Sequence, residues 1–344
     1  MNEKYLYING RIFSHSLSGI PIYAREIIKY FDKEKILYQI ISPKEHIRGI
    51  NGHLWEQIIL PQKIKKNSLL WNPAGTGPIY YPNQITTIHD ISPIVHKEWF
   101  SKKYALWYQF ITPSILKKSK KIITISEFSK SEILRVYKID EKKIKVIYNG
   151  FQKMYRIIEF GNQENEKIRN SIPGNYFLYV GTIEPRKNIN IILKAWEKYM
   201  KAKKDNFLVI IGSKDSGKVF AEYKLEKNNN NIIIKGYVPN EEMPYYYGNA
   251  LALIYPSLYE GFGLPPLEAI ACGTNIIISD IPVHKEIYKN IAFYFNPHNY
   301  NELLEIMINI EKIKFEREKL AIYAQNYNIE KNCENTLKTI MGII

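Results

Sequence analysis

The chain contains no continuous apolar run of about 18 residues, the length that a membrane-spanning helix needs. Its first residues, MNEKYLYINGR, do not have the charged and then apolar layout of a signal peptide. Only two cysteines occur, Cys272 and Cys333, which excludes a disulfide framework and a metal site built on cysteine spacing. Cys272 lies in an apolar helical run and is expected to be a small core residue. These absences predict a cytoplasmic protein.

Acidic residues are scarce in the first half of the chain. Residues 1–155 hold 25 Lys and Arg against 12 Asp and Glu, whereas residues 156–344 hold 23 against 22. Nearly all of the net charge of +14 therefore lies in the first half. Such an excess is typical of proteins that bind nucleic acid or an anionic membrane. A sequence rich in Lys, Asn and Ile also accumulates surface lysines that serve no partner, so this alternative stays open.

With 344 residues, of which 45% are apolar, the chain is long enough for two domains. Short β-branched runs alternate with helical patterns in both halves, which predicts two doubly wound α/β domains with parallel sheets. A polar tract over residues 152–172 is predicted to link them, and the last third has a helical pattern from residue 302. The expected strands are 4–9, 36–42, 85–88, 121–126 and 144–150 in the first half, and 176–182, 207–213, 231–237, 251–257 and 275–279 in the second.

One stretch, EGFGLPPLEAIACGT over residues 260–274, carries the strongest local signal. It follows a strand-like apolar run and begins with a loop that contains Gly261 and Gly263. Two prolines then open a helical run, which Gly273 closes. A strand, a glycine loop and a helix in this order direct backbone N–H groups and the positive end of a helix dipole at one point. This arrangement suits a phosphate.

Two carboxylates, Glu260 and Glu268, bracket the same loop. Both would repel a phosphate, so they must serve a different part of any ligand. A ligand with phosphates and hydroxyl-rich groups satisfies both features, and a nucleotide sugar is such a ligand. Turns of this kind also occur in α/β proteins that bind nothing there, so the turn alone leaves a structural role open.

The spacing of the two glutamates around EGFGLPPLEA resembles the donor-site signature of the family-4 retaining glycosyltransferases, which have the GT-B fold. GTIEPRKN (181–188) matches a second motif of that family, and HLWEQIILP and SLLWNPAGTGPIYYPNQITTIHD are similar to the N-terminal half of its bacterial polysaccharide members. The resemblance implies two Rossmann-like domains facing a cleft. An acceptor domain over 1–155 and a donor domain over 156–327 are expected, with a final helix near 328–344 packing back on the first.

The resemblance also implies roles for individual residues. Arg186 and Lys187 are expected to grip the donor diphosphate, Glu260 to hold sugar hydroxyls and Glu268 to accept hydrogen bonds from the ribose. Because the family transfers its sugar with retention on one face and without metal, we expect no metal, no cofactor and no covalent nucleophile. The other donor-binding residues that the match implies are Gly19, Gly181, Thr182, Tyr237, Val238, Gly261, Phe262, Gly263 and Leu264.

His89 and Asp90 follow a β-branched run, at the carboxyl end of a predicted strand, where ligands of parallel sheets gather. The pair matches the family, which implies that His89 is a catalytic residue that contacts the donor sugar or the reacting face. Asp90 is expected to orient the histidine or to cap the next segment. The loop after the first strand departs from the family pattern, since it has only Gly19, with Pro21 where a second glycine is common.

Residues 99–121, WFSKKYALWYQFITPSILKKSKK, mix aromatic side chains with lysines at both ends. Such a mix is typical of a segment that lies at a membrane surface, and Pro113 is predicted to interrupt any helix there. An ordinary packed helix with a solvated basic end is the alternative. The acceptor that fits both the basic half and this segment is a lipid-diphosphate-linked glycan at the inner leaflet of the plasma membrane.

The sequence therefore predicts a peripheral glycosyltransferase that moves a hexose from a nucleotide sugar to a glycan in surface polysaccharide synthesis. GDP-mannose is the first expectation for the donor, because the similarity is closest to bacterial O-antigen and capsule mannosyltransferases. The alternatives are a nucleotide-sugar epimerase of the same fold and a non-enzymatic basic protein that binds membrane or nucleic acid. The paired glutamates disfavour nucleic acid, because carboxylates repel a phosphate backbone.

Overall fold

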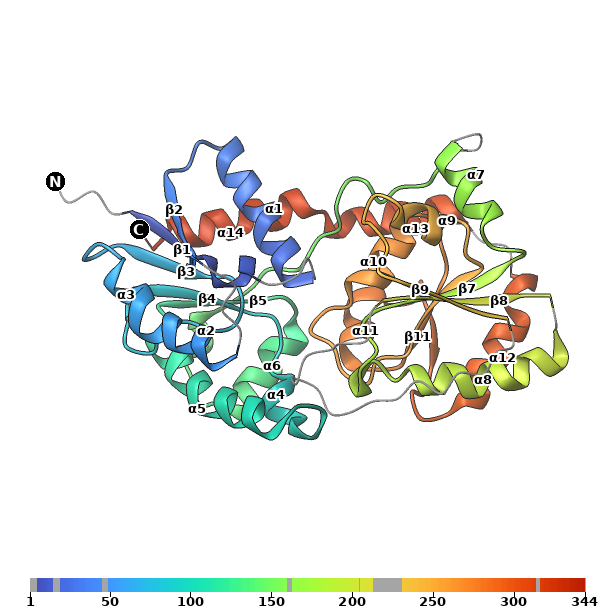
Figure 1. Cartoon of the computed structure of the whole chain (residues 1–344), viewed down its shortest axis with the longest axis horizontal. Coiled ribbons are helices and arrows are strands. Elements are labelled where there is room, and N and C mark those ends of the chain that lie inside the picture. The colour runs from blue at the N-terminus through green and yellow to red at the C-terminus, as the bar shows by residue number, and fades with distance from the viewer. Residues whose placement is uncertain are drawn as a thin grey trace. The chain divides into compact units, whose positions relative to one another are not determined.

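The structure is a computed structural model that describes residues 5–14, 19–44, 49–159, 163–203, 205–212, 231–313 and 316–343 (Figure 1). The chain divides into two compact units. The first comprises Met1–Val95, Lys102–Gly150 and Ile329–Ile344, and the second comprises His96–Ser101 and Phe151–Asn328. Within the described residues, no helix has the length and apolar character that crossing a membrane requires.

The first unit is built on a six-stranded sheet whose strands are all parallel, in the order β2-β1-β3-β4-β5-β6. Most of these strands are buried along their length because apolar and β-branched residues face helices on both sides of the sheet. The strands are β1 (Leu6–Asn9), β2 (Tyr38–Ile41), β3 (Leu69–Asn72), β4 (Gln84–Ile88), β5 (Lys121–Thr124) and β6 (Ile144–Val146).

The helices of the first unit alternate with these strands, as a doubly wound sheet requires. They are α1 (Gly19–Lys33), α2 (Ile50–Leu54), a π-helical turn (Trp55–Ile59), α3 (Leu60–Gln62), α4 (Ser92–Val95), α5 (Lys102–Lys118), α6 (Glu127–Val136) and α14 (Ile329–Met341). Ser126 caps α6 by accepting a hydrogen bond from the Ser129 N–H.

Helix α14 belongs to the first unit although it follows the whole second unit in sequence (Figure 1). It packs against α1, and its buried residues Ile329, Cys333 and Ile340 share one apolar cluster with strand residues such as Ile8 and Trp71. The core of the first unit therefore contains side chains from both ends of the chain.

The second unit repeats the architecture with a six-stranded parallel sheet in the order β12-β11-β10-β7-β8-β9. Its strands are β7 (Tyr176–Val180), β8 (Phe207–Ile211), β9 (Ile232–Gly236), β10 (Ala252–Tyr255), β11 (Ile276–Ser279) and β12 (Phe293–Phe295). Its helices are α7 (Gln163–Asn170), α8 (Ile189–Ala202), α9 (Met243–Gly248), α10 (Leu264–Ala271), α11 (Pro282–Tyr288), α12 (Tyr300–Asn309) and α13 (Arg317–Ala324).

The predicted fold class, two doubly wound parallel sheets, is confirmed, and three local expectations need correction. The second sheet has one more strand than the predicted segments, β12, which has only three residues. The expected linker contains helix α7, because its Ile168 is buried in the second unit. Helix α5 continues through Pro113. Both Pro113 and Gln109, whose carbonyl loses its helical donor, are exposed, so water can solvate that carbonyl.

Candidate active site

The residues expected to bind the donor follow the carboxyl ends of strands in the second sheet. Arg186 and Lys187 lie in a 3-10 turn, Pro185–Lys187, after β7, and Glu260 lies in the loop after β10. Because β7 and β10 are neighbouring parallel strands, their carboxyl ends meet at one edge of the sheet. A hydrogen bond from the Leu258 N–H to the Arg186 carbonyl (2.9 Å) joins the two loops directly.

Glu260 is the centre of a buried ion cluster. Its Oε1 accepts from Lys187 Nζ at 2.6 Å and from the Tyr255 hydroxyl at 2.9 Å, and its Oε2 accepts from Arg186 Nη1 at 2.9 Å. Glu184, only 1% exposed, holds Arg186 from the other side, with 2.8 Å between Arg186 Nη2 and Glu184 Oε1. Two cations and two carboxylates thus balance one another away from bulk water.

The cluster keeps its members charged in spite of burial. Burial alone would raise the pKa of the Glu260 carboxyl, but Arg186 and Lys187 outweigh it and hold that pKa well below its usual range. Burial lowers the pKa of the Lys187 ammonium, and the Glu260 carboxylate partly offsets that effect. The ammonium also lies over the Tyr255 ring, 4.9 Å from its centroid. An ionised Glu260 and a cationic Lys187 follow from this geometry.

Asn188 fixes the turn that presents the two cations. Its φ of 52° lies in the left-handed region, which asparagine tolerates better than most residues. Its side-chain amide donates to the carbonyls of Pro256 (3.2 Å) and Pro297 (2.8 Å). The asparagine of the PRKN segment therefore has a structural reason to stand there.

The glycine loop before α10 has a backbone that only glycine adopts easily. Gly263, the residue before the helix, has a φ of +95°, and a β-carbon on it would lie 3.5 Å from His284 Nε2. The Tyr288 hydroxyl donates to the Gly263 carbonyl. His284 and Tyr288, both fully buried on α11, therefore pack against the loop at Gly263. Phe262, in the loop itself, is also buried.

Glu268 lies one turn into α10 and has a different environment from Glu260. Its Oε2 accepts from the Tyr247 hydroxyl of α9 at 2.9 Å. Burial raises the pKa of the Glu268 carboxyl to about 7, although the hydroxyls of Tyr247 and Tyr155 counteract the rise. No cation contributes to that balance, so Glu268 changes charge near neutral pH.

The remaining expected donor residues of the second unit follow β7 and β9. Gly181 lies so close to Gly212 that a β-carbon on Gly212 would come within 2.0 Å of the Gly181 carbonyl oxygen. The Thr182 carbonyl accepts from the Tyr179 hydroxyl at 3.0 Å. Tyr237 is 66% exposed and Val238 is buried, both just after β9. All four positions thus lie at the carboxyl edge of the same sheet.

His89, in the first unit, follows β4 at the carboxyl edge of that sheet. Its Nε2 lies 2.9 Å from the Pro73 carbonyl oxygen, so Nε2 carries the proton and Nδ1 keeps its lone pair. Burial lowers the pKa of the His89 imidazole, and its ring meets the Tyr23 ring edge to face at 4.9 Å. A neutral imidazole with a defined tautomer is the result.

The structure also shows the surroundings of two further residues of the first unit, Asp90 and Gly19. Asp90 accepts from the backbone N–H (2.8 Å) and the hydroxyl (2.6 Å) of Ser92, so it caps α4, one of the two roles expected for it. Gly19 is the first residue of α1, and a β-carbon there would meet no atom within 4 Å. Packing within the described protein therefore does not require glycine at this position.

Two family models match the chain and together cover most of it. The model for glycosyl transferases group 1 matches residues 162–327, and the model for glycosyltransferase family 4 matches residues 71–152. The chain belongs to the family-4, group 1 glycosyltransferases. The family that the glutamate spacing and the PRKN motif suggested is thereby confirmed.

Curated relatives of this glycosyltransferase include two enzymes of O-antigen synthesis. The chain is 32% identical to the O-antigen chain mannosyltransferase RfbU of Salmonella typhimurium over 249 residues, which are 72% of this chain and 66% of that protein. It is 30% identical to the O-antigen chain mannosyltransferase B of Escherichia coli over 239 residues, 66% of this chain and 62% of that protein. The matched region spans slightly less than two thirds of the length of each relative.

Solved structures agree with the glycosyltransferase fold over the whole chain. WaaG, a glycosyltransferase involved in lipopolysaccharide biosynthesis, superposes with a TM-score of 0.73 at 15% identity, covering 98% of both chains. HepE of Anabaena, solved in complex with UDP and glucose, superposes with a TM-score of 0.72 at 14% identity, covering 98% of this chain and 99% of that one. The predicted GT-B fold of this glycosyltransferase is thus confirmed.

A second buried polar cluster of this glycosyltransferase was missed by the sequence reasoning. It lies in the first unit, where Glu56, 1% exposed, accepts from Arg11 (2.8 Å), Asn9 (2.8 Å) and Thr76 (2.9 Å). Asn9 ends β1 and Thr76 follows β3, so the cluster stands at the carboxyl edge of the first sheet. Its only sequence signal was a charged residue within the apolar segment WEQIIL.

Metal ligation has little support among the groups that the structure describes. No three or more His, Cys, Asp or Glu side chains are grouped there in a way that could hold a metal ion. The two cysteines are free and buried, and Cys272 lies in the core behind the donor loop, as expected.

Proposed function

We propose that this family-4, group 1 glycosyltransferase transfers mannose from a nucleoside diphosphate sugar to a glycan hydroxyl with retention of configuration. The observation that carries the proposal is the buried cluster of Arg186, Lys187 and Glu260 at the carboxyl edge of the donor sheet. A pair of cations beside a glycine loop and a helix N-terminus suits the diphosphate, and the carboxylate suits the sugar.

The leaving group determines what the cations do. When the bond between the sugar and the diphosphate breaks, negative charge develops on the leaving phosphate oxygen. Arg186 and Lys187 stabilise that charge, assisted by backbone N–H groups of the segment 262–264. Both side chains are held in position by several partners before the reaction begins. Removal of one such preorganised group typically costs about 100- to 1,000-fold in rate.

The two glutamates divide the remaining donor contacts. Glu260, kept ionised by its cations, accepts hydrogen bonds from sugar hydroxyls and so fixes the anomeric carbon against the acceptor. Glu268 accepts hydrogen bonds from the ribose once it has lost its proton. Tyr237 and Val238, after β9, border the nucleobase, and Gly181 and Thr182 border the diphosphate. Gly19, the first residue of α1 in the first unit, is expected near the phosphates.

His89 completes the catalytic set in this proposal. Its tautomer is fixed by the Pro73 carbonyl, which leaves Nδ1 as a hydrogen-bond acceptor. In the proposed reaction this neutral imidazole contacts the donor sugar or the reacting face. It does not form a covalent intermediate, since the transfer proceeds on one face of the sugar.

The choice of mannose rests on the relatives. RfbU and the Escherichia coli enzyme B are both named as O-antigen chain mannosyltransferases. GDP-mannose is the corresponding donor, and the growing chain of a surface polysaccharide, carried on a lipid diphosphate, is the corresponding acceptor. We place the enzyme at the inner face of the plasma membrane as a peripheral protein.

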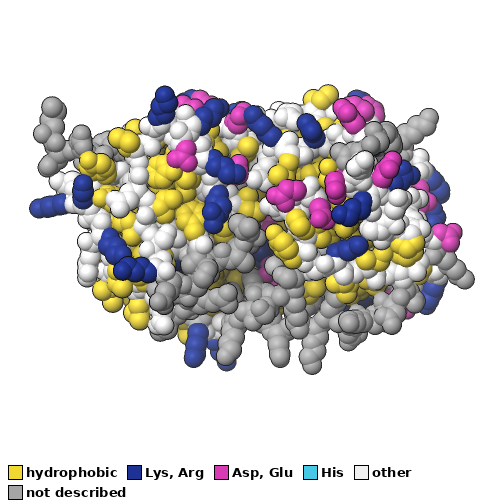
Figure 2. All heavy atoms as spheres, turned by 45° about the horizontal axis from the view of Figure 1, so that its top comes forward, with side chains coloured by type: hydrophobic (Ala, Val, Ile, Leu, Met, Phe, Trp, Pro, Cys, Tyr) yellow, Lys and Arg dark blue, Asp and Glu magenta, His cyan; other side chains and the backbone are white. Residues whose placement is uncertain are grey.

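Helix α5 supports this placement. Leu106 and Phe110 are 64% and 66% exposed, and they lie one turn apart on the same face as the exposed Pro113. Lysines stand at both ends of this exposed apolar face, Lys102 and Lys103 at its start and Lys117 and Lys118 at its end. On the face drawn in Figure 2, acidic side chains are sparser over the first unit than over the second. Such a helix can lie on an anionic leaflet.

A transfer assay tests the proposed function. Purified enzyme is incubated with GDP-mannose, UDP-hexoses and dTDP-rhamnose in separate reactions, with membrane-extracted lipid-linked glycan as acceptor. Product formation and its anomeric configuration are read by NMR. We expect transfer from GDP-mannose with retention, and a decrease of about 100-fold or more in the Arg186→Ala and Lys187→Ala variants. Inverted product, or full activity in both variants, contradicts the proposal.

A further inference from the structure

A cavity lies at the edge of the first sheet that is opposite to the edge with His89. It has a volume of about 450 Å³ and is lined by residues that come just before three neighbouring strands. Lys66 and Asn67 precede β3, Asn83 precedes β4 and Lys120 precedes β5. Since all strands of this sheet are parallel, these residues share the amino edge, whereas His89 follows β4 at the carboxyl edge. The cavity is therefore separate from the proposed reaction face.

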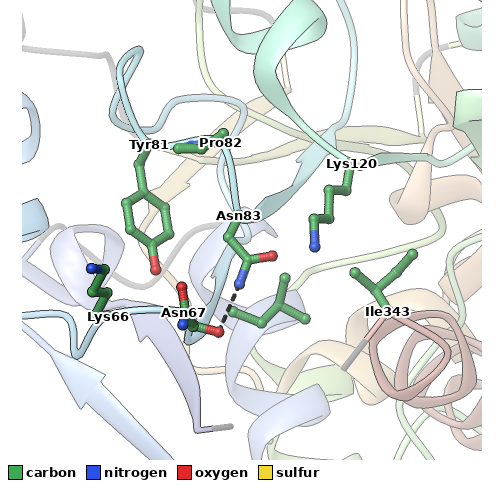
Figure 3. A pocket seen from close by; sticks show the side chains of 8 residues that line it. Lys66, Asn67, Tyr81, Pro82, Asn83, Lys120 and Ile343 are labelled. Atoms are coloured by element: carbon green, nitrogen blue, oxygen red, sulfur yellow. Dashed lines mark hydrogen bonds between the residues drawn. The ribbon is translucent and has the colours of Figure 1, made fainter.

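The floor of the cavity is apolar and its walls are fixed. Leu69 and Ile343 supply aliphatic surface, and the Tyr81 ring is held by a hydrogen bond from its hydroxyl to the Ser68 carbonyl (2.5 Å). The Asn83 side chain donates from Nδ2 to the same carbonyl at 2.7 Å. In Figure 3, Asn83 stands between Tyr81 on one side and Lys120 and Ile343 on the other.

Two lysines of the cavity differ from their neighbours in the chain. Lys65 lies over the Tyr5 ring, 4.4 Å from its centroid, and Lys121 Nζ donates to the Lys142 carbonyl at 2.7 Å. The side-chain ammonium groups of Lys66 and Lys120, by contrast, have no ion pair or hydrogen bond with another residue among those that the structure describes. The cavity lining, within the same described set, includes no acidic residue. The cavity thus concentrates uncompensated positive charge over an apolar floor.

One acceptor in the wall also lacks a donor. Asn83 Oδ1 is buried and receives no hydrogen bond in the described structure. The amide cannot be turned to remove this deficiency without breaking the bond from Nδ2 to the Ser68 carbonyl. Figure 3 shows Oδ1 directed toward Lys120, an exposed side chain that lines the cavity. A ligand hydroxyl that reaches Oδ1 when Lys120 swings aside would satisfy it.

We propose that this cavity binds a phosphate ester, with the phosphate between Lys66 and Lys120 and the ester carbon chain on Leu69, Tyr81 and Ile343. A hydroxyl of the esterified alcohol donates to Asn83 Oδ1. Two ammonium groups that lack carboxylate partners match a phosphate in charge, and the apolar floor matches the aliphatic part of its ester. Both a phospholipid headgroup and a soluble polyol phosphate have this chemistry.

Binding is tested with both sources of the ligand. Vesicles of phosphatidylcholine with phosphatidylglycerol are compared with vesicles of phosphatidylcholine alone by co-sedimentation. Glycerol 3-phosphate is titrated calorimetrically at constant ionic strength. The variant Lys66→Ala/Lys120→Ala removes the two charges, and Lys44→Ala/Lys138→Ala is the matched control, because these exposed lysines of the same unit do not line the cavity.

We expect the cavity variant to lose about 30-fold in affinity for one of the two ligands, as two lysines at about 1 kcal/mol each imply. The control variant keeps the affinity of the unmodified protein. A loss confined to vesicles identifies a lipid headgroup, and a loss confined to glycerol 3-phosphate identifies a soluble ester. Equal binding by the cavity variant and the control in both experiments overturns the proposal. Since both lysines lie at the amino edge of the first sheet, opposite to the edge that His89 follows, transfer from the nucleotide sugar to a soluble acceptor stays unchanged in either case.

Discussion

At the scale of single residues, the cations of the proposed donor site are already paired with carboxylates of the protein. Glu260 forms ion pairs with the Lys187 ammonium and the Arg186 guanidinium, and Glu184 forms a further ion pair with the same guanidinium. The four charges cancel, so the cluster by itself offers no net positive charge to a diphosphate. In the proposed reaction Glu260 must exchange at least part of its contact with the cations for contact with the sugar hydroxyls. Diphosphate binding and sugar binding then depend on the same carboxylate.

This dependence predicts opposite effects of Glu260→Gln on two measurements. Loss of one negative charge beside the cations should increase the affinity for free nucleoside diphosphate by about tenfold, because a charge-assisted hydrogen bond contributes about 1.5 to 3 kcal/mol. The rate of sugar transfer should fall by about 100-fold or more, since the amide no longer fixes the sugar as a carboxylate does. Calorimetry and the transfer assay give the two values, and Glu305→Gln, at an exposed position on α12, is the control. Weaker diphosphate binding by Glu260→Gln would show that the carboxylate does not compete with the ligand.

Glu268 predicts a pH dependence of nucleotide binding. Burial raises its pKa to about 7, and only the ionised carboxylate accepts hydrogen bonds from both ribose hydroxyls. Affinity for the nucleoside diphosphate should therefore rise with pH up to about 7 and level off above it. Each pH unit below the pKa should cost about tenfold if the ionised form alone binds. Calorimetry between pH 5.5 and pH 8.5, with phosphate ionisation of the ligand corrected by the Glu268→Gln variant, measures the slope. A slope in Glu268→Gln as steep as that of the unmodified protein contradicts this role.

The same group has a stability consequence of opposite sign. A carboxyl with a raised folded-state pKa binds its proton more tightly in the native state than in the unfolded state. Its contribution to stability is therefore greatest below its ordinary pKa and decreases as the pH rises through about 7. Stability and donor binding thus respond to pH in opposite directions at Glu268, which separates the two effects experimentally.

The sequence could predict the members of the donor cluster but not their contacts. Arg186, Lys187 and Glu260 stand in motifs of fixed spacing at strand ends, and parallel topology brings strand ends together. Tyr255, Tyr288 and His284 lie in ordinary apolar segments, and their contacts with Lys187 and Gly263 depend on tertiary packing. The raised pKa of Glu268 depends in the same way on burial beside Tyr247 and Tyr155. The roles of the site residues in catalysis stay predictions until they are measured.

At the scale of single elements, the loop between β10 and α10 is constrained at Gly263 by its backbone conformation and by a hydrogen bond. The carbonyl of Gly263 receives the Tyr288 hydroxyl, and its backbone has a φ of +95°. Helix α10 begins immediately after it, so a change in this dihedral angle tilts the first helical turn and the N–H groups that precede it. The direction of the α10 dipole therefore depends on the backbone conformation of Gly263.

Gly263→Ala should accordingly lower the free energy of unfolding by about 1 to 2 kcal/mol, the usual cost of a side chain in left-handed backbone. It should also weaken nucleoside diphosphate binding, because the loop N–H groups move. Gly19→Ala is the matched control for stability alone, since a β-carbon on Gly19 meets no atom of the described protein and α1 accepts alanine well. Thermal unfolding compares the two variants, and calorimetry compares nucleotide binding by Gly263→Ala with that of the unmodified protein. Equal stability of the two would show that the loop relaxes without strain.

The elements that the sequence did not predict correctly depend on their surroundings in the folded protein. Helix α7 is polar along most of its length and keeps its place because Ile168 is buried and Asn165 accepts from Asn249 at 2.6 Å. Helix α5 passes through Pro113 because the freed carbonyl faces water. Strand β12 has three residues and, within the described sheet, lies at the edge, where it pairs with β11. In each case a contact with a distant segment, or solvent, decides the conformation instead of the local pattern.

At the scale of the whole molecule, the two units differ in which separate segments of the chain form them. The second unit is built from His96–Ser101 and one long segment, Phe151–Asn328, whereas the first unit needs Ile329–Ile344 in addition to its own two segments. Ile340, fully buried in α14, packs in the cluster that contains Phe31 of α1 and Leu6 of β1. The first unit is therefore complete only when residues more than 300 positions apart have met.

Ile340→Ala tests this dependence. Truncation of a buried isoleucine typically costs about 2 to 5 kcal/mol, and here the cost should fall on the first unit alone. Amide hydrogen exchange should increase in β1 and α1, far from the substitution in sequence, and stay unchanged in β7 and β10 of the second unit. Met341→Ala, at the neighbouring position with 45% of its surface exposed, should leave both units as they were. Faster exchange confined to α14, with β1 and α1 still protected, would mean that the first unit is stable without the end of the chain. Faster exchange in the second unit as well would mean that the two units unfold as one body.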